Sequence, residues 1–200
     1  MVNFSGVPVG TELFLVSKEF AHGGTAQGKQ SFNILKFKVA VALTDSFTVP
    51  ASLSVINSIP ASSAVKTRTF DISNAMEHHG VPMNNGMQMR HRINGKLFDS
   101  SRIDENVSAN TTEIWVFDNS KGDEPHPMHL HGVFFQVLDR TGGRGAKIAS
   151  ESGWKDTVLV MPGETVRVLV PFENNKGKFV FHCHNLEHED DGMMLQYQLS

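Results

Sequence analysis

The chain has 200 residues, of which 40% are hydrophobic and 20% charged, and carries a formal net charge of -3 with a pI near 6.3. This length suffices for one good-sized domain or two small ones, and the slight acidity gives no electrostatic reason to expect binding to nucleic acid or an anionic membrane. No run of about 18 apolar residues is present to span a bilayer, and residues 1–10 lack the basic and apolar parts of a secretory signal peptide.

Short β-strands are predicted along nearly the whole chain. The runs that alternate in polarity, or are rich in β-branched and aromatic residues, are 12–16, 32–42, 113–117, 133–138, 157–160, 165–170 and 179–181. Turns rich in Gly, Pro, Asn and Asp separate these runs. The one helical expectation is a short turn within residues 186–191. The pattern predicts an all-β fold, a β-sandwich with Greek-key connections.

A change of composition between residues 44 and 65 divides the chain. Residues 46–65 are rich in Pro, Ser and Ala and are predicted to be a linker. Residues 1–45 hold only two or three predicted strands, which are too few to close a sandwich. Residues 66–200 hold seven or eight. We therefore expect 66–200 to be a complete domain and 1–45 to be the tail of a preceding one.

Histidine is the unusual feature of the composition. Six of the ten histidines fall into two short clusters, at residues 126–131 and 182–188. The second cluster also contains Cys183, the only cysteine, so no internal disulfide is possible. The presence of this thiol must therefore be explained by packing, by reactivity or by metal binding.

Strand geometry sorts these side chains onto two faces. Residues two apart along a strand share a face. His129 therefore lies with His131, and His182 lies with His184, while Cys183 points the other way. Two facing imidazole pairs suit metals bound between them, and Cys183 suits a different metal on the reverse face. The Cys183 backbone would then give electrons a short covalent path between the two sites.

A cysteine, two imidazoles and a weak axial thioether form a blue copper electron-transfer site. Cys183, His188 and Met193 supply three of these ligands from one loop, and His126 supplies the second imidazole from a neighbouring strand. Zinc is a poor alternative, because structural zinc takes a closed tetrahedron and usually more than one Cys. A Cys/His protease leaves six clustered histidines without a role.

At these residues the chain resembles the third cupredoxin domain of the multicopper oxidases, which include laccases, bilirubin oxidase and the bacterial cuprous oxidases. The resemblance runs through Gly95–Phe98, Thr111–Trp115, His126–Gly132, Gly153–Thr157 and His182–Met194, and the last of these is most similar to bacterial members. It implies a cupredoxin-like Greek-key β-sandwich, preceded by the terminal strands of an incomplete second cupredoxin domain.

The resemblance also implies roles by position. The type 1 copper ligands would be His126, Cys183, His188 and Met193, the last because the family places its axial residue ten positions after the Cys. His129 would bind type 2 copper, and the type 3 pair would be bound by His131, His182 and His184.

Three further positions carry weaker expectations. Glu189 matches the acidic residue thought to relay protons to oxygen in bacterial members. Asp156 is expected to orient a type 1 imidazole from outside the ligand set. The stretch 76–91, with four methionines and three histidines, is suggested as an auxiliary Cu(I) contact.

The implied function is a copper oxidase that reduces O2 to water with electrons from phenols, aromatic amines or cuprous ions. A trinuclear cluster in this family takes four histidines from the first domain and four from the third. We therefore expect the chain to be a fragment, or one piece of a split enzyme, that shares type 2 and type 3 copper with an N-terminal cupredoxin domain.

Two alternatives remain open at this stage. One is a non-enzymatic type 1 electron carrier or copper-binding module, in which four of the histidines would be unused. The other is an inert product of a broken reading frame. By analogy with the family, the location would be periplasmic or extracellular.

Overall fold

The computed structural model describes residues 3–19, 29–42, 48, 50–51, 54–73, 75–77 and 88–200, with no side-chain description for 75–77 and 88–90. The chain divides into two compact units, Met1–Val55 and Ile56–Ser200. The domain limits expected from composition stay a prediction.

The first unit contains an antiparallel hairpin of β1 (Glu12–Ser17) and β2 (Phe32–Lys38). Several of its apolar side chains are about half exposed, among them Phe14 (48%), Leu35 (49%) and Phe32 (56%). Two strands have no second layer against which to bury an apolar face.

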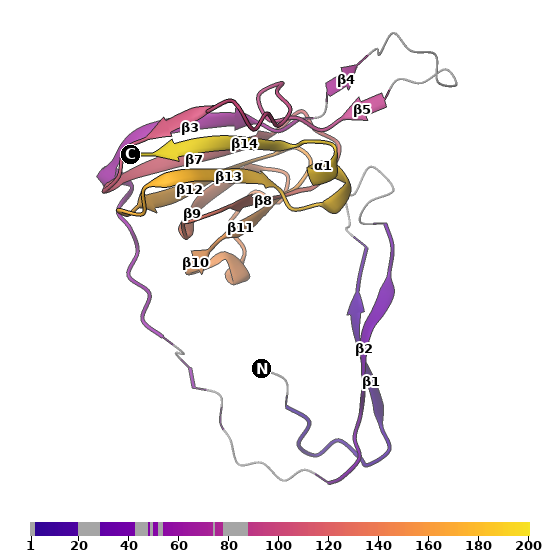
Figure 1. Cartoon of the computed structure of the whole chain (residues 1–200). Coiled ribbons are helices and arrows are strands. Elements are labelled where there is room, and N and C mark those ends of the chain that lie inside the picture. The colour runs from indigo at the N-terminus through magenta and orange to yellow at the C-terminus, as the bar shows by residue number, and fades with distance from the viewer. Residues whose placement is uncertain are drawn as a thin grey trace. The chain divides into compact units, whose positions relative to one another are not determined.

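The second unit is built of two five-stranded sheets (Figure 1). The first sheet has the order β10-β9-β12-β7-β3, with strands at Trp154–Lys155, Phe135–Gly142, Glu164–Phe172, Thr111–Asn119 and Ala64–Asp71. The second has the order β11-β8-β13-β14-β6, with strands at Thr157–Val160, His126–Leu130, Gly177–Cys183, Met194–Leu199 and Glu105–Val107. The pairs β3–β7 and β14–β6 are parallel, and the other pairs in these sheets are antiparallel.

Short elements complete this unit. They are the hairpin β4 (Ala75–Glu77) and β5 (Gln88–Arg90), two 3-10 turns at Ala61–Ser63 and Ala149–Glu151, and the one-turn helix α1 (Leu186–Asp190). In the described part of the chain, no helix has the length and apolar character needed to cross a membrane.

The predicted all-β class is confirmed, with differences in detail. The strand expected at 32–42 ends at Lys38, and the sandwich has more strands than the seven or eight expected. Pattern alone missed β14, β6 and β3, and β3 begins at Ala64 inside the predicted linker. Two of these strands lie at sheet edges in parallel pairs, which no local turn signals.

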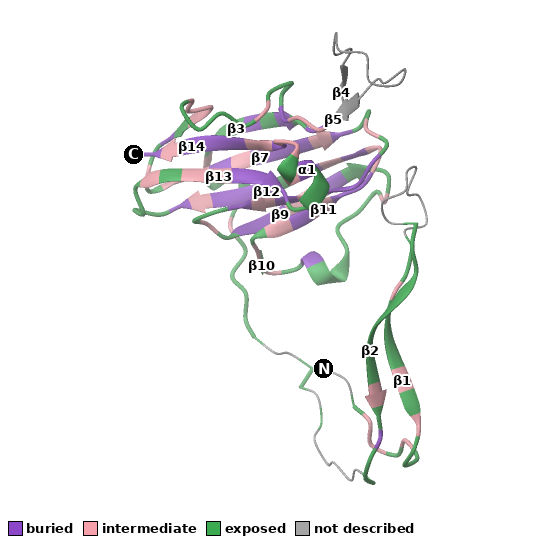
Figure 2. Ribbon diagram, turned by 45° about the vertical axis from the view of Figure 1, so that its right-hand side comes forward, coloured by how far each residue is buried: buried purple, intermediate pink, exposed green. Residues whose placement is uncertain are grey.

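An aromatic cluster joins the two sheets at their centre. Trp115 lies with its ring centroid 4.8 and 5.6 Å from Phe70 and Phe172 of its own sheet. It lies 4.9 and 5.6 Å from Phe181 and Tyr197 of the facing sheet. All five are fully buried or nearly so, in the interior seen in Figure 2. Burial of each large apolar side chain contributes about 1.5–3 kcal/mol to stability, so this cluster fixes how the two sheets pack.

Glu164, the first residue of β12, lies in a buried ionic network. Its carboxylate accepts hydrogen bonds from the backbone N–H groups of Met161 at 2.8 Å and Arg144 at 2.9 Å, and pairs with the guanidinium groups of Arg140 and Arg144. Burial alone would raise the pKa of Glu164, but these hydrogen bonds and the charge of Arg140 outweigh it and lower the pKa to about 2. The carboxylate is therefore ionised throughout the neutral range.

We expect Glu164→Gln to lower the free energy of unfolding at pH 7 by about 3 kcal/mol, because it leaves buried arginine charge uncompensated. The wild-type carboxylate has a lower pKa in the folded state than the unfolded value of 4.5, so its contribution is present above pH 4.5 and is lost as the pH falls through about 2. Urea unfolding of the copper-free protein should therefore show a steeper acid dependence for wild type than for the variant. Glu173→Gln, at an exposed carboxylate, is the control, and an equal loss in both variants would contradict this role.

Candidate metal centre

Two neighbouring strands, β8 and β13, carry the histidine clusters and divide the side chains of each cluster between the two faces of one sheet. His182 lies opposite His129, and Cys183 lies opposite Met128. Along β8, His126 and Met128 are buried, and His129 between them is more exposed. Because side chains alternate, His126 and Cys183 face the interior of the sandwich, whereas His129 and His182 face the other side.

A short loop after β13 brings two further side chains to the interior face. The N–H of Met193 donates to the carbonyl of His188 at 2.9 Å, and the N–H of Cys183 donates to the carbonyl of Met193 at 3.1 Å. Gly192 has φ +95°, which a residue with a side chain adopts only with strain, and its carbonyl accepts from the N–H of Phe98 at 2.9 Å. The loop is therefore closed by its own backbone and fastened to a distant segment.

Three ligand atoms converge at this interior site. The Nδ1 atoms of His126 and His188 are 3.1 Å apart, and the Sγ of Cys183 lies 3.6 and 3.5 Å from them. A point equidistant from all three lies about 2.0 Å from each, close to the length of a metal–imidazole bond. Neither ring has a hydrogen-bond partner at Nε2, and all three residues and Met193 are fully buried. A thiolate, two imidazoles and a nearby thioether fit copper.

Burial sets the protonation states of these ligands. It lowers the pKa of His126 to about 2, helped by the neighbouring His188 and His91, and it lowers the pKa of His188 to about 3. It raises the pKa of the Cys183 thiol to about 12. At neutral pH both imidazoles are thus ready to bind a metal, and the thiol must lose its proton when the metal binds.

Two residues at this site were not predicted as its members. The ring of His91 stacks on that of His188, with centroids 3.5 Å apart and planes at 13°. The Oε2 of Glu124 lies 3.2 Å from Nε2 of His188 and 3.4 Å from Nε2 of His91, although the His188 approach is not aligned as a hydrogen bond. Position two before His126 was the only sequence signal for Glu124, and His91 was singled out only as part of the suggested Cu(I) contact at residues 76–91.

The suggested Cu(I) contact at residues 76–91 is therefore represented by His91 alone. His78, His79, Met83 and Met87 lie outside the described residues, and the side chains of the other two methionines are not described. This expectation stays a prediction.

Four imidazoles gather on the other face, from His129, His131, His182 and His184. Their ring centroids lie 4.8 to 5.5 Å apart in five pairs, and the Nε2 atoms of His131 and His182 are 3.1 Å apart. Burial and the charge of its neighbours lower the pKa of His131. Lowering its pKa favours the neutral imidazole of His131, the form that binds a metal.

Backbone carbonyls orient two of these rings. Nδ1 of His129 lies 2.9 Å from the carbonyl oxygen of Asp156, and Nδ1 of His182 lies 3.0 Å from that of Cys183. Each Nδ1–H is placed to donate, which leaves Nε2 as the free ligand atom.

Asp156 and Glu189 both lie beside this outer cluster. Asp156 was expected to orient a type 1 imidazole, but its carbonyl serves His129 instead. The Oε2 of Glu189 lies 3.5 Å from Nδ1 of His182, and the side chain is 32% exposed.

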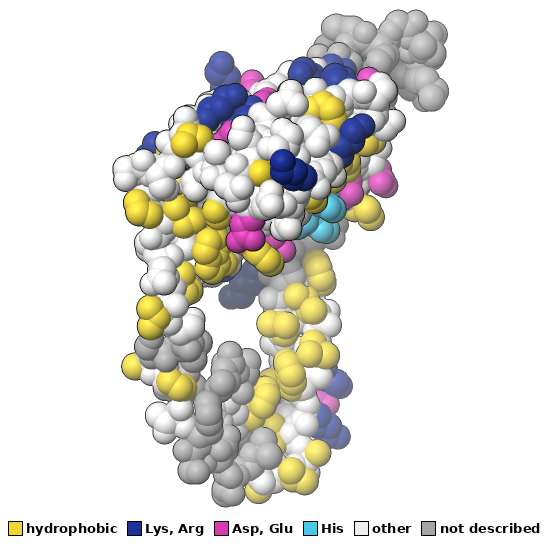
Figure 3. Space-filling view, turned by 60° about the vertical axis from the view of Figure 1, so that its left-hand side comes forward, with side chains coloured by type: hydrophobic (Ala, Val, Ile, Leu, Met, Phe, Trp, Pro, Cys, Tyr) yellow, Lys and Arg dark blue, Asp and Glu magenta, His cyan; other side chains and the backbone are white. Residues whose placement is uncertain are grey.

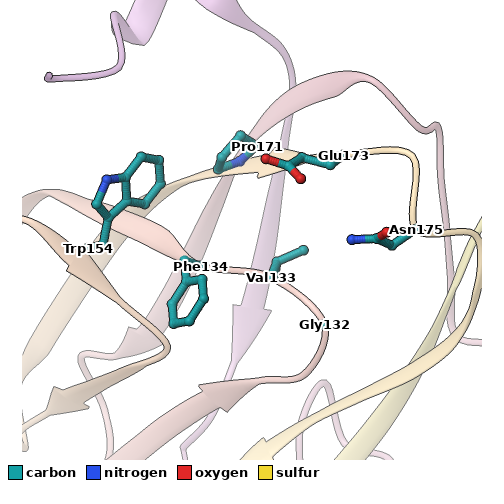
Figure 4. Close-up of a pocket in the computed structure, with 7 residues that line it drawn as sticks. All are labelled: Gly132, Val133, Phe134, Trp154, Pro171, Glu173 and Asn175. Atoms are coloured by element: carbon teal, nitrogen blue, oxygen red, sulfur yellow. The ribbon is translucent and has the colours of Figure 1, made fainter.

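The outer cluster opens onto the surface of the second unit. Histidine side chains reach the surface there beside acidic and apolar ones (Figure 3). His129 and His131 line a hollow, and a cavity of about 480 Å³ shares the lining residues Val133 and Phe134 with it. Figure 4 shows Phe134 and Trp154 at this cavity, and their side chains are 63% and 47% exposed.

Comparisons with known proteins bear on the fold and the family of this chain. The family model described as multicopper oxidase matches residues 67–200. A laccase of Haloferax volcanii is 37% identical over 180 residues, covering 87% of this chain and 30% of the laccase. A laccase of Bacillus subtilis is 30% identical over 202 residues, covering 92% of this chain and 37% of the laccase.

The crystal structure of a laccase from Pediococcus acidilactici superposes with a TM-score of 0.74 at 36% identity, covering all of this chain and 38% of that one. The cupredoxin-like fold expected from the motifs is thereby confirmed. The chain spans about a third of the length of these relatives.

We expect copper binding at pH 7 to release about one proton per copper, because the thiol of Cys183 is the only interior ligand that is protonated in the folded chain. Isothermal titration of copper(II) in buffers of different ionisation enthalpy measures this number. His126→Gln, which keeps the thiol, is the control and should still release the proton with any copper that it binds. A wild-type release near zero would show that the thiol is not a ligand.

Proposed function

Because the chain belongs to the multicopper oxidase family, we propose that it forms the electron-accepting part of a copper oxidase that reduces O2 to water. The observation that carries this proposal is the pair of centres built back to back on one strand. The thiol of Cys183 meets two buried imidazole nitrogens within 3.6 Å on one face. The flanking residues His182 and His184 join the four-imidazole cluster on the other.

The proposed ligand sets follow from this arrangement. Type 1 copper would be held by His126, Cys183, His188 and Met193, and type 2 copper by His129. The type 3 pair would be held by His131, His182 and His184. Copper bound at these ligands would supply the redox chemistry, namely one-electron acceptance at the interior centre and four-electron reduction of O2 at the outer one, with the four protons coming from solvent.

The chain itself supplies the route between the centres. Cys183 is bonded directly to His182 and His184, so its backbone joins the two ligand sets without a gap. The hydrogen bond from His182 Nδ1 to the Cys183 carbonyl, at 3.0 Å, adds a second short path. The core rigidly fixes both paths, because β13 pairs with strands on either side.

Glu189 is the residue proposed to move protons to the outer centre. It belongs to α1, is partly exposed to solvent, and approaches Nδ1 of His182 at 3.5 Å. A carboxylate with one side in water and the other beside a ligand ring can take up a proton and pass it inward.

The outer centre requires a partner. Two of its imidazoles, those of His129 and His131, line a surface hollow, and Phe134 and Trp154 are exposed beside it. We propose that an N-terminal cupredoxin domain of the same enzyme covers this apolar rim and contributes the remaining imidazoles. Without it, the chain would act as a type 1 electron-transfer module, which is the second candidate function.

The proposed electron donor is a phenol, an aromatic amine or a cuprous ion. Relatives named laccase and bilirubin oxidase support an aromatic donor. A donor of this kind gives up one electron at a time, as a single type 1 copper requires.

Loading the 200-residue chain with copper should produce an intense blue colour, because a thiolate bound to copper(II) absorbs strongly by charge transfer. Cys183→Ser should abolish the visible band, while circular dichroism shows an intact fold. A folded, copper-loaded wild type without colour would refute the type 1 assignment.

Met193→Leu should raise the reduction potential and keep the blue band, because a weak axial sulfur stabilises the oxidised copper. Redox titration of the band measures the shift. Met194→Leu, at the adjacent residue on β14, is the matched control and should leave the potential unchanged. Equal potentials in wild type and Met193→Leu would show that Met193 is not axial.

The chain alone should bind about one copper tightly and reduce O2 negligibly, because the outer centre offers only part of an imidazole set and open coordination sites fill with water. Adding an N-terminal cupredoxin segment from a related oxidase as a separate chain should raise the copper content and start oxygen uptake. Metal analysis and an oxygen electrode measure both. If the chain alone oxidises a phenol as fast as a whole laccase, the cluster assembles between copies of this chain instead.

A further inference from the structure

The ligands of the proposed type 1 site are out of reach of a donor in solution. The side chains of His126, Cys183, His188 and Met193 are all fully buried. In many redox proteins the electron enters where a ligand edge meets solvent, but none of these edges does. The electron must therefore cross another side chain first.

Two of the described side chains lie against the imidazole of His188, one at its ring face and one at its Nε2. They are His91 and Glu124, which are 13% and 10% exposed. The imidazole of His91 lies face to face with that of His188, at 3.5 Å and 13°. Two aromatic rings in van der Waals contact overlap through their π electrons. The carboxylate of Glu124 offers no such overlap, so His91 is the better electronic contact.

The backbone holds His91 in this position. Its N–H donates to Oδ2 of Asp191 at 3.3 Å, and Asp191 is the C-cap of α1, the helix that carries His188. Seven residues further on, the N–H of Phe98 donates to the carbonyl of Gly192 at 2.9 Å. The segment 91–98 is thus bound to the ligand loop at both ends, and these contacts hold the ring of His91 against that of His188.

We infer that His91 is the electron-entry residue of the type 1 site, through which a reducing donor passes its electron to His188. The inference rests on the proposed function. The donor would lose one electron, and a copper(II) ion bound by His188 would gain it and become copper(I). Neither imidazole is oxidised, reduced or protonated in this step, and no bond is formed or broken.

The test follows the bleaching of the blue band by hexaammineruthenium(II), a one-electron donor that transfers no proton. The copper-loaded 200-residue chain is mixed with the donor in a stopped-flow instrument without oxygen. The reduction potential of each variant is titrated separately, so that rates are compared at equal driving force. His91→Leu should slow reduction about tenfold, because it removes the stacked ring and retains bulk, whereas His91→Phe should stay within about threefold of wild type.

Phe98→Leu is the matched control, since it removes an exposed aromatic ring from the same segment and should leave the rate unchanged. His91→Gln is a second ring-free variant in case the leucine variant does not fold. Equal rates for wild type and the ring-free variants would overturn the inference, as would a phenylalanine variant as slow as leucine. A wild-type chain that never turns blue would instead refute the proposed type 1 site itself.

Discussion

The alternation of side chains along a single β-strand is the constraint on which both centres depend. Cys183 must point inward because Phe181, two residues before it, packs in the aromatic core. His182 must then point to the other face, and His184 follows it just beyond the strand end. A shift of one residue in the β8–β13 register would turn the thiol outward and separate it from His126. The centres are therefore a consequence of core packing rather than an addition to it.

The two centres differ in how far they are buried. The interior site is sealed, so its imidazoles are kept neutral and its thiol protonated until a metal arrives. The outer cluster has an open side, and its rings are oriented by carbonyl groups rather than by enclosure. A sealed site excludes small molecules such as O2, whereas an open one admits them. In the proposed function, electron entry and oxygen chemistry would thus be separated by the thickness of one sheet.

Short-range patterns made much of this predictable, and long-range contacts did not. The motifs at 126–131 and 182–193 contain the proposed ligands, and period-two alternation sorts most of them by face. His91 and Glu124 were missed because their contacts with His188 depend on chain segments 97 and 64 residues away in sequence. Edge strands such as β6 were missed because their three residues carry no pattern without the partner strand. Asp156 was misplaced because a backbone carbonyl, not its side chain, makes the contact.

The interior ligands are held in place before any metal binds, and the core bears the energetic cost of that arrangement. Burying neutral imidazoles without hydrogen-bond partners at Nε2 is unfavourable, since each loses its bonds to water. The compensation lies in the same two sheets, where Trp115 and its aromatic neighbours join the layers and Glu164 neutralises two arginines. A scaffold with this rigidity limits how far the ligands can move between oxidation states. The proposed type 1 copper would therefore meet ligands whose positions are set by residues outside the ligand set.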